Sequence, residues 1–211
     1  MNILMIGPPG VGKGTIGRLL SKKLRLPHLA MGDVMRDHIT RGTSFGKMAK
    51  SRMDKGDFVP DEKVVKQFFL MTKRNKRYSK GMILDGFPRT IFQANLLKNK
   101  GFLLDKVIYL TSPDKLLIKR LSNRRVCPQC KRVYNLLTQP PKKKGVCDDD
   151  GTALVHRDDD KSEVVKHRLD VYALRTKELV NHLKKESCLL TINGVGTPQT
   201  VLGRVLTKLR K

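Results

Sequence analysis

Aromatic residues, long apolar runs, acidic residues and cysteines are scarce or absent in the sequence, and each shortage argues against a class of protein. There is no tryptophan and there are only four tyrosines among 211 residues, so the chain is poor in the aromatic side chains on which single-stranded nucleic acids stack. No apolar run approaches the roughly 18 residues of a membrane-spanning helix. The chain also enters an apolar strand at its start, without the pattern of a signal peptide. We therefore expect a cytoplasmic protein with no membrane contact.

Acidic side chains are scarce relative to basic ones. The chain has 44 lysines and arginines against 19 aspartates and glutamates, a formal net charge of +25. Such a field attracts polyanions, but the lysines are scattered along the chain instead of gathered in one block. We interpret most of them as solvated and expect no specific nucleic-acid partner, while weak, salt-sensitive polyanion binding stays open.

Cysteine is also rare, with four residues in the chain. In a cytoplasmic protein these thiols are expected to be reduced or bound to metal, because disulfides are uncommon in that compartment. A chain of this length buries one sizeable core and leaves no room for a second full domain.

A glycine-rich stretch organises the chain: residues 7–15 read GPPGVGKGT, after an apolar run at 3–6 and before a helical pattern. The glycines let backbone N–H groups converge on an anion, and the following helix aims its positive end at the same point. Lys13 can then reach the outer phosphates of a nucleotide, and Thr15 places a hydroxyl near the metal-bound end of a triphosphate. The stretch therefore predicts a phosphate-binding loop.

Apolar segments of strand length alternate with helical patterns, which predicts a parallel sheet covered by helices on both faces. Strands are expected at residues 3–6, 26–30, 81–85, 106–110 and 188–192, and the helices include 32–40, 44–55, 113–123, 162–186 and 197–211. Residues 30–60 hold two short helical patterns and are too small a stretch to fold alone, and residues 124–160 have too few apolar side chains to build a core of their own. We expect one α/β core of residues 1–29, 61–123 and 161–211 that carries these two stretches as insertions.

Asp85 ends the apolar strand at residues 81–85. Ligands of parallel α/β sheets bind at the carboxyl ends of the strands, so this carboxylate lies across from the phosphate-binding loop. There it is placed to hold the waters around Mg²⁺. The alternative is a carboxylate that only caps a helix or turn.

The second insertion carries a pattern typical of a metal site. Cys127 and Cys130 form one C-x2-C pair, and Cys147 with Asp150 repeats the spacing as C-x2-D. Two such pairs bring four ligands into the tetrahedron of a structural zinc site, with Asp148 and Asp149 as weaker candidates for the fourth ligand. Zinc would supply folding free energy to a segment without a core of its own. The alternative is a set of reduced thiols beside an acidic turn; Cys188 is interpreted as inert core.

The chain resembles the adenylate kinases over essentially its whole length. The resemblance rests on motifs in the family's order: the phosphate loop with Gly14 between Lys13 and Thr15, Met31-Gly32-Asp33 with Arg36, Leu84 to Thr90 with Gln93, Arg120, Arg124-Arg125, the cysteine-bearing segment, and Arg157 to Asp159 with Arg168. It implies a P-loop nucleoside-kinase fold with a five-stranded parallel sheet, in which residues 30–60 bind AMP and residues 124–160 form a lid. The zinc pattern is similar to the lid of some bacterial members.

The resemblance also implies a reaction and a set of roles. The reaction is ATP + AMP ⇌ 2 ADP with Mg²⁺, without a covalent intermediate, in a monomer. Gln93 would read the adenine edge, and Met31 stands where the family usually has Ser or Thr. The implied catalytic residues are Lys13, Asp85, Arg89, Arg124, Arg157 and Arg168. ATP would be bound by Gly10, Val11, Gly12, Lys13, Gly14, Thr15, Arg120, Arg124, Val133, Tyr134 and Gly196; AMP by Met31, Arg36, Asp57, Phe58, Val59, Gly86, Phe87, Pro88, Arg89, Gln93, Arg157 and Arg168; Asp158 and Asp159 would orient the lid arginines.

Two alternatives stay open from the residues alone. One is a kinase for another nucleoside monophosphate, which assays with AMP, CMP, UMP and GMP would separate. The other is a basic, zinc-containing P-loop protein that binds nucleic acid without forming ADP. Several arginines beside loops at one sheet edge favour a kinase, because phosphoryl transfer needs two phosphates held in line and surrounded by cations.

Overall fold

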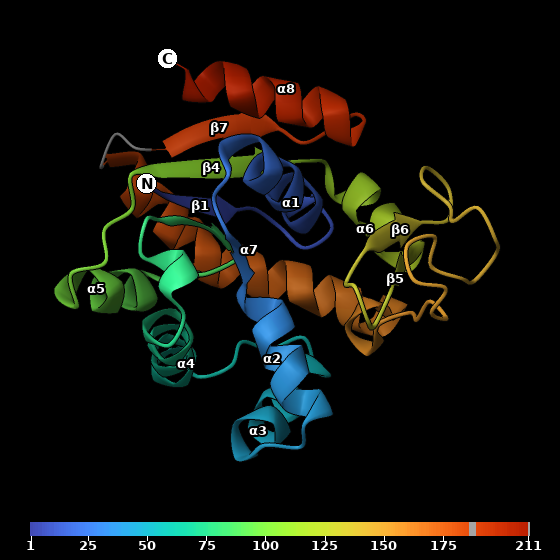
Figure 1. The fold of residues 1–211 in the computed structure, drawn as a ribbon, viewed down its shortest axis with the longest axis horizontal. Helices are drawn as coiled ribbons and strands as arrows, with labels where there is room; N and C mark the ends of the chain where they lie inside the picture. The colour runs from blue at the N-terminus through green and yellow to red at the C-terminus, as the bar shows by residue number, and fades with distance from the viewer. Residues whose placement is uncertain (186–188, 211) are drawn as a thin grey trace.

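Five parallel strands form the centre of the computed structural model, which describes residues 1–185 and 189–210. The sheet order is β2-β3-β1-β4-β7, and every neighbouring pair is parallel (Figure 1). The strands are β1 (Asn2–Ile6), β2 (His28–Ala30), β3 (Met82–Asp85), β4 (Lys106–Thr111) and β7 (Leu189–Asn193). The predicted α/β class and the five-stranded parallel sheet are confirmed; Cys188 lies outside the described residues.

The central strand β1 shows why both faces of the sheet are covered. Its residues 3–6 are at most 1% exposed, and alternate side chains of a strand point to opposite faces. Ile3 and Met5 pack in a cluster with α1 (Lys13–Leu24) and α8 (Pro198–Leu209). Leu4 and Ile6 pack in a second cluster with α4 (Asp61–Lys73), α5 (Ile91–Asn99) and α7 (Ser162–Lys185). A continuous apolar run therefore marks a strand buried on both sides.

Helices α2 (Met31–Thr40) and α3 (Ser44–Met53) pack against each other and project from the sheet, at the lower end of Figure 1. Thr43 caps α3 by accepting a hydrogen bond from the Gly46 N–H at 3.0 Å. The predicted start of α2 at Gly32-Asp33 is one residue late. Ala30 is the cap residue and has no side-chain acceptor, so no side chain caps the helix. The Asp33 carboxylate, in the first turn, bonds the Arg36 guanidinium.

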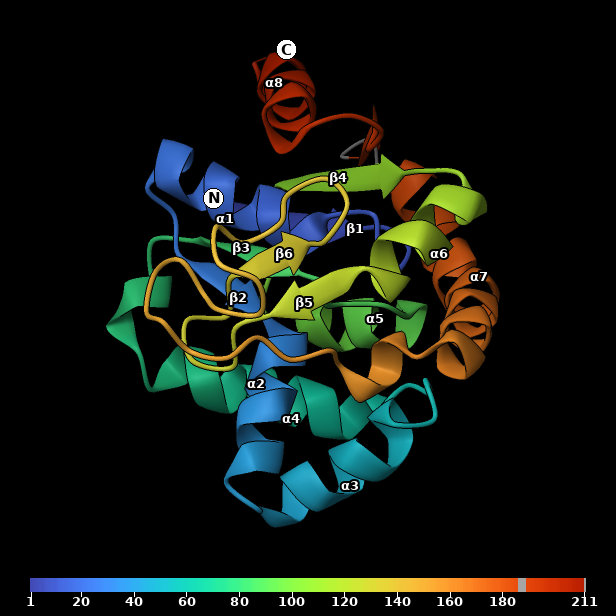
Figure 2. The same cartoon turned by 90° about the vertical axis from the view of Figure 1, so that its right-hand side faces the viewer.

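Residues 124–160 form a second projection, which Figure 1 shows beyond the carboxyl ends of the strands and Figure 2 shows in front of them. It follows α6 (Asp114–Ser122) and contains an antiparallel hairpin, β5 (Arg124–Val126) with β6 (Val133–Asn135), and the short helix η2 (Asp158–Asp160). The sequence did not predict the hairpin, since strands of three residues are too short to show a period. The short helix η1 (Lys76–Tyr78) was also not predicted, and the other predicted boundaries differ from the observed ones by a residue or two.

The order of the strands determines where a ligand can bind. β1 lies between β3 and β4; the chain places β2 and β3 on one side of β1 and then β4 and β7 on the other. In open α/β sheets, the crevice at the carboxyl ends of strands next to such a reversal is the usual ligand site. Among the described residues, no helix has the length and apolarity to cross a bilayer.

Candidate active site

One cavity of about 290 Å³ opens at this carboxyl edge, between the glycine-rich loop, α2, the β3–α5 loop, the hairpin and α7. Nearly all the residues that the sequence assigned to nucleotides line it; Pro88, Tyr134 and Asp158 do not. The predicted residues that line it are Gly10, Val11, Gly12, Lys13, Gly14, Thr15, Met31, Arg36, Asp57, Phe58, Val59, Asp85, Gly86, Phe87, Arg89, Gln93, Arg120, Arg124, Val133, Arg157, Asp159, Arg168 and Gly196.

The glycine-rich loop connects β1 to α1 and forms one wall of the cavity. Gly10 and Gly12 have φ values of 83° and 103°, a left-handed region that disfavours residues with a Cβ. Gly12 is also the cap residue of α1 and supplies no side-chain acceptor. The first N–H groups of α1, together with the positive end of its dipole, are therefore available to an anion.

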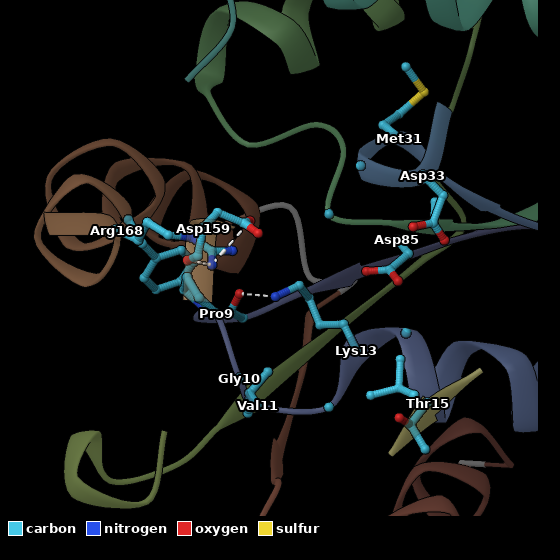
Figure 3. Close-up of a pocket in the computed structure, with 18 of the residues that line it drawn as sticks. Pro9, Gly10, Val11, Lys13, Thr15, Met31, Asp33, Asp85, Asp159 and Arg168 are labelled. Atoms are coloured by element: carbon cyan, nitrogen blue, oxygen red, sulfur yellow. Dashed lines mark hydrogen bonds and ion pairs between the residues drawn. The ribbon is translucent and has the colours of Figure 1, made fainter. Parts of the chain in front are cut away.

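Lys13 begins α1 and folds back over the loop, where its Nζ donates hydrogen bonds to the carbonyl oxygens of Gly7 at 2.6 Å and Pro8 at 2.9 Å. Burial lowers the pKa of Lys13 to about 7. The positive charges of Arg89, Arg168 and Arg124 also lower this pKa, whereas the negative charge of Asp85 raises it. Figure 3 shows Lys13 and Asp85 pointing into the same space. A phosphate in this space would favour the charged ammonium.

Asp85 ends β3 opposite the loop, as the sequence predicted, and its side chain is 12% exposed. Its Oδ2 lies 3.4 Å from the Nε2 of His28 at the start of β2. Burial alone would raise the pKa of Asp85, but the contact with His28 and the charges of Lys13 and Arg89 outweigh it and hold the pKa below its usual value. Asp85 is therefore an anionic acceptor beside Lys13, which suits the predicted role at metal-bound water.

Five arginines from five segments converge on the cavity: Arg36, Arg89, Arg124, Arg157 and Arg168. Arg157 shows the effect of crowding, because burial and the charges of Arg36 and Arg124 lower its pKa to about 9. Burial and Arg168 also lower the pKa of Arg89, whose Nε donates to the Gly86 carbonyl at 2.6 Å. The cavity therefore has a positive field with fixed donors, which fits several phosphate groups.

Aspartates form ion pairs with these arginines. Asp160 and Asp158 lie differently from what the sequence analysis expected. Asp160 is fully buried and accepts from Arg124 at 2.7 and 2.5 Å and from Arg168 at 3.0 Å. Asp159 pairs with Arg168 at 3.1 Å, as Figure 3 shows. Asp158 was expected to act with Asp159, but its side chain is 65% exposed and pairs with Lys161. The turn of η2 points it away from the arginines, so Asp160 takes the place that the sequence assigned to Asp158.

Asp33 is a second residue to which the sequence analysis assigned no role, although it lies in the Met31-Gly32-Asp33 motif. Its Oδ1 accepts from Arg36 at 2.7 Å and lies 3.7 Å from Arg157. Burial would raise the pKa of Asp33, but Arg36 and Arg157 outweigh it and keep the pKa low. Asp33 therefore connects α2 to the segment before η2 across the cavity. Its place next to Met31-Gly32 was the signal available in the sequence.

The side of the cavity toward α2 and α4 is mostly apolar. Met31, Val59 and Val64 line it and are at most 5% exposed, and the Arg89 guanidinium lies 5.4 Å from the centre of the Phe58 ring. Asp57 also lines it, but its carboxylate contacts His167 at 2.8 Å. This side therefore offers flat apolar contact for a base, with few polar groups.

Gln93 is the main polar side chain on this side, and it is 3% exposed. Its Oε1 accepts from the Arg89 backbone N–H at 2.7 Å, and its Nε2 donates to Asp61 Oδ1 at 2.7 Å. Asp61 also accepts from the Thr90 hydroxyl at 3.0 Å. The sequence assigned no role to Asp61, because it lies 32 positions away and is not itself a lining residue.

The opposite side of the cavity is formed by the hairpin and the loop after β7. Arg120 crosses it and donates to the Gly194 carbonyl at 3.1 Å, and Asn135, Thr138 and Gln139 add polar lining that the sequence analysis missed. Tyr134 is 2% exposed and turns away from the cavity: its hydroxyl accepts from the Asp148 N–H at 2.8 Å. Val133 thus remains on the cavity wall, while its neighbour belongs to the cysteine cluster.

The predicted metal ligands come together at the tip of the hairpin. One ligand atom from each of Cys127, Cys130, Cys147 and Asp150 lies within 4.8 Å of the others. Cys127 Sγ lies 3.2 Å from Asp150 Oδ2, and the sulfurs of Cys130 and Cys147 are 3.6 Å apart. Burial raises the pKa of the Cys130 thiol to about 12, and a bound dication would reverse that preference. Three soft thiolates and one carboxylate in this spacing fit Zn²⁺.

Asp148 and Asp149 are placed differently from Asp150. Both pair with Arg132, Asp148 at 3.5 Å, and Asp148 Oδ1 also accepts from the Lys142 N–H at 2.8 Å. The structure therefore favours Asp150 as the fourth ligand, as the spacing predicted.

Comparison with known proteins identifies relatives along the whole chain. The family model described as Adenylate kinase matches residues 5–188. A protein named adenylate kinase from Anaeromyxobacter sp. (strain K) is 40% identical over 206 residues, which covers 96% of each chain. The adenylate kinase of Kosmotoga olearia is 42% identical over 200 residues, 92% of each chain, and that of Methanocella arvoryzae is 41% identical over 217 residues, 100% of this chain and 99% of its own.

Proposed function

This chain belongs to the adenylate kinase family, and from that premise we propose that it transfers a phosphoryl group reversibly from MgATP to AMP, giving two ADP. One observation carries the proposal. Six cationic side chains (Lys13 and the five arginines) from six segments converge on one cavity at the carboxyl edge of the sheet. Phosphoryl transfer asks the protein mainly to hold two phosphate chains in line and to neutralise the charge on the moving group.

The two substrates would enter from opposite sides. We assign the ATP phosphates to residues 10–15 and Arg124, and its base to the side formed by Arg120, Val133 and Gly196. We assign AMP to the apolar side with Gln93, and its phosphate to Arg36 and Arg89. We assign Arg157 and Arg168 to the AMP phosphate and to the transferred group. On this proposal, residues 30–60 form the AMP-binding insertion and residues 124–160 form the lid.

Mg²⁺ would enter with ATP and supply charge neutralisation at the phosphates. Thr15 and Asp85 are the residues expected to hold it, Asp85 through water. The lid would exclude bulk water, because water reaching the transferred group would hydrolyse ATP. We further propose that the four ligands around Cys127 bind structural zinc, and that the protein acts as a monomer in the cytoplasm, where free thiols persist.

The direct test is ADP formation from MgATP and each of AMP, CMP, UMP and GMP, with purified protein whose zinc content has been measured. Activity with AMP that greatly exceeds the other three supports the proposal. The matched control is Lys13→Met, which removes the ammonium but keeps a side chain of similar length. We expect it to abolish turnover while the circular dichroism spectrum stays unchanged. Equal rates with all four monophosphates, or no ADP at all, would refute the proposal.

A further inference from the structure

We propose that Asp61 is a positioning residue that determines which base the monophosphate site accepts, because it prevents the Gln93 amide from turning over. This inference rests on the proposed function and names a specificity device within that same site. Asp61 itself does not line the cavity, so it would act through Gln93 alone.

The Gln93 amide is held at both of its ends by groups whose hydrogen-bonding roles cannot change. The Arg89 backbone N–H, 2.7 Å from Oε1, can only donate. The Asp61 carboxylate, 2.7 Å from Nε2, can only accept while it is ionised. Turning the amide by half a rotation would set the NH₂ group against the N–H and the carbonyl oxygen against the carboxylate. Both hydrogen bonds would be lost at a side chain that is 3% exposed, so the turned state is strongly disfavoured.

The surroundings also fix Asp61. Its Oδ2 accepts from the Thr90 hydroxyl at 3.0 Å, and the same hydroxyl oxygen accepts from the Gln93 backbone N–H at 3.1 Å. Thr90 is therefore the cap of α5 and at the same time the second partner of Asp61. This closed set of hydrogen bonds joins the start of α4 to the start of α5.

The fixed amide leaves one donor and one acceptor for a ligand. Of its two N–H bonds and two carbonyl lone pairs, Asp61 and Arg89 use one each. The Watson–Crick edge of adenine carries an acceptor at N1 and a donor at N6, which match that remaining pair. Hypoxanthine and guanine carry the reverse, a donor at N1 and an acceptor at O6. A freely rotating glutamine would serve both kinds of edge, whereas the held glutamine serves only the first.

The other side chains near Gln93 contribute little to the choice between one base and another. Met31, Val59 and Val64 present apolar side chains, so they offer apolar contact to a planar base but no hydrogen bond to its edge. The choice between the two purine edges then falls to the orientation of Gln93. A site built around fixed hydrogen bonds rejects a mismatched edge because its own polar groups are left unpaired.

The first experiment uses the unmodified protein with MgATP and three monophosphates: AMP, inosine monophosphate (IMP) and purine riboside monophosphate. IMP reverses the edge without adding the 2-amino group of GMP, so bulk does not confound the comparison. We expect kcat/KM for AMP to exceed that for IMP by about 10- to 100-fold. Purine riboside monophosphate, which keeps the N1 acceptor and lacks the N6 donor, should fall between them. Equal values for AMP and IMP would overturn the inference without any variant.

The second experiment compares Asp61→Asn with Glu62→Gln. The amide that replaces the Asp61 carboxylate can donate through its nitrogen to a turned Gln93 while its oxygen still accepts from Thr90. The turned orientation then loses only the hydrogen bond from the Arg89 N–H, so it is much less disfavoured than beside the carboxylate. We expect the AMP to IMP ratio of kcat/KM to fall by about tenfold, with IMP activity less affected than AMP activity or increased. Glu62 is exposed in the same first turn of α4. Glu62→Gln therefore removes an equivalent charge near the helix start and should leave the ratio unchanged.

The outcomes separate this inference from the proposed function. If the unmodified protein forms ADP from AMP and prefers AMP to IMP, but Asp61→Asn keeps that preference, only the positioning role of Asp61 is wrong. A loss of activity with both monophosphates in equal proportion would make Asp61 merely structural and would also overturn the inference. Absence of AMP phosphorylation in the unmodified protein refutes the proposed function itself.

Discussion

Asp160 and Asp158 allow a stringent test of how the arginine cluster is held together. They are two positions apart on the same short helix, so Asp160→Asn and Asp158→Asn are the same chemical change in nearly the same sequence. Asp160 is fully buried and accepts three hydrogen bonds from Arg124 and Arg168. The Asp158 side chain is 65% exposed and pairs with Lys161.

The two variants should lose different amounts of stability, because Asp160 is buried and Asp158 is exposed. Removing one partner of a buried ion pair costs about 3–5 kcal/mol. The side chains of Arg124 and Arg168 are each 17% exposed, so neither charge is fully sealed from water and the lower end, about 3 kcal/mol, is expected for Asp160→Asn. In a chain of this length that loss lowers Tm by about 6–12 °C. Breaking the exposed pair of Asp158 should cost less than about 1 kcal/mol.

Thermal unfolding followed by circular dichroism would measure both variants beside the unmodified protein. A second set of unfolding measurements contains a saturating concentration of a compound that mimics both substrates, in which five phosphates join two adenosines. Because the cluster without Asp160 carries one more uncompensated positive charge, the phosphates should restore a large part of the lost Tm. Equal Tm changes in the two variants would refute the assignment of Asp160 as the residue that holds Arg124 and Arg168.

Three further predictions concern the proton of Lys13, the metal and Arg89. Phosphate charge should raise the pKa of Lys13 from its value of about 7 in the free protein, so nucleotide binding at about pH 8.5 should take up close to one proton. Calorimetry in buffers of different ionisation enthalpy measures this uptake, and Lys13→Met should abolish it; identical heats in all buffers would contradict the lowered pKa. Cys130→Ser should lose bound zinc and lower the Tm of the lid before that of the core, whereas unchanged metal content would rule out the site. Arg89→Ala should reduce kcat by about 10²- to 10³-fold while ATP affinity changes little, and a normal turnover number would remove Arg89 from the proposed machinery.

Much of the site could be predicted because its motifs are local. The glycine-rich loop lies within nine consecutive residues, and its conformation follows from φ values that only glycine adopts readily. The candidate metal ligands come as two pairs of closely spaced residues, so short loops bring each pair together. The apolar run of β1 predicted a strand buried on both faces, and both faces are covered. Side chains in such motifs depend on neighbours a few residues away.

Other residues could not be placed from spacing. Three consecutive aspartates follow Arg157, and nothing in their order says which of them faces the arginines; the path of η2 decides that Asp160 does. Asp61 and Gln93 belong to different helices, and their hydrogen bond exists only because the starts of α4 and α5 meet. The β5–β6 hairpin was missed for a similar reason, since three-residue strands are defined by the partner they pair with.

The sequence by itself thus determined the α/β architecture, the glycine-rich loop, the cluster of three cysteines with Asp150 and the family, because each of these depends on residues that are close together or on a pattern repeated along the chain. Only the tertiary structure decided which carboxylate faces which arginine and which partners hold the two ends of the Gln93 amide. Those choices depend on the direction of a side chain at a contact between distant segments. Spacing along the chain carries no information about that direction; the packing of the folded elements does.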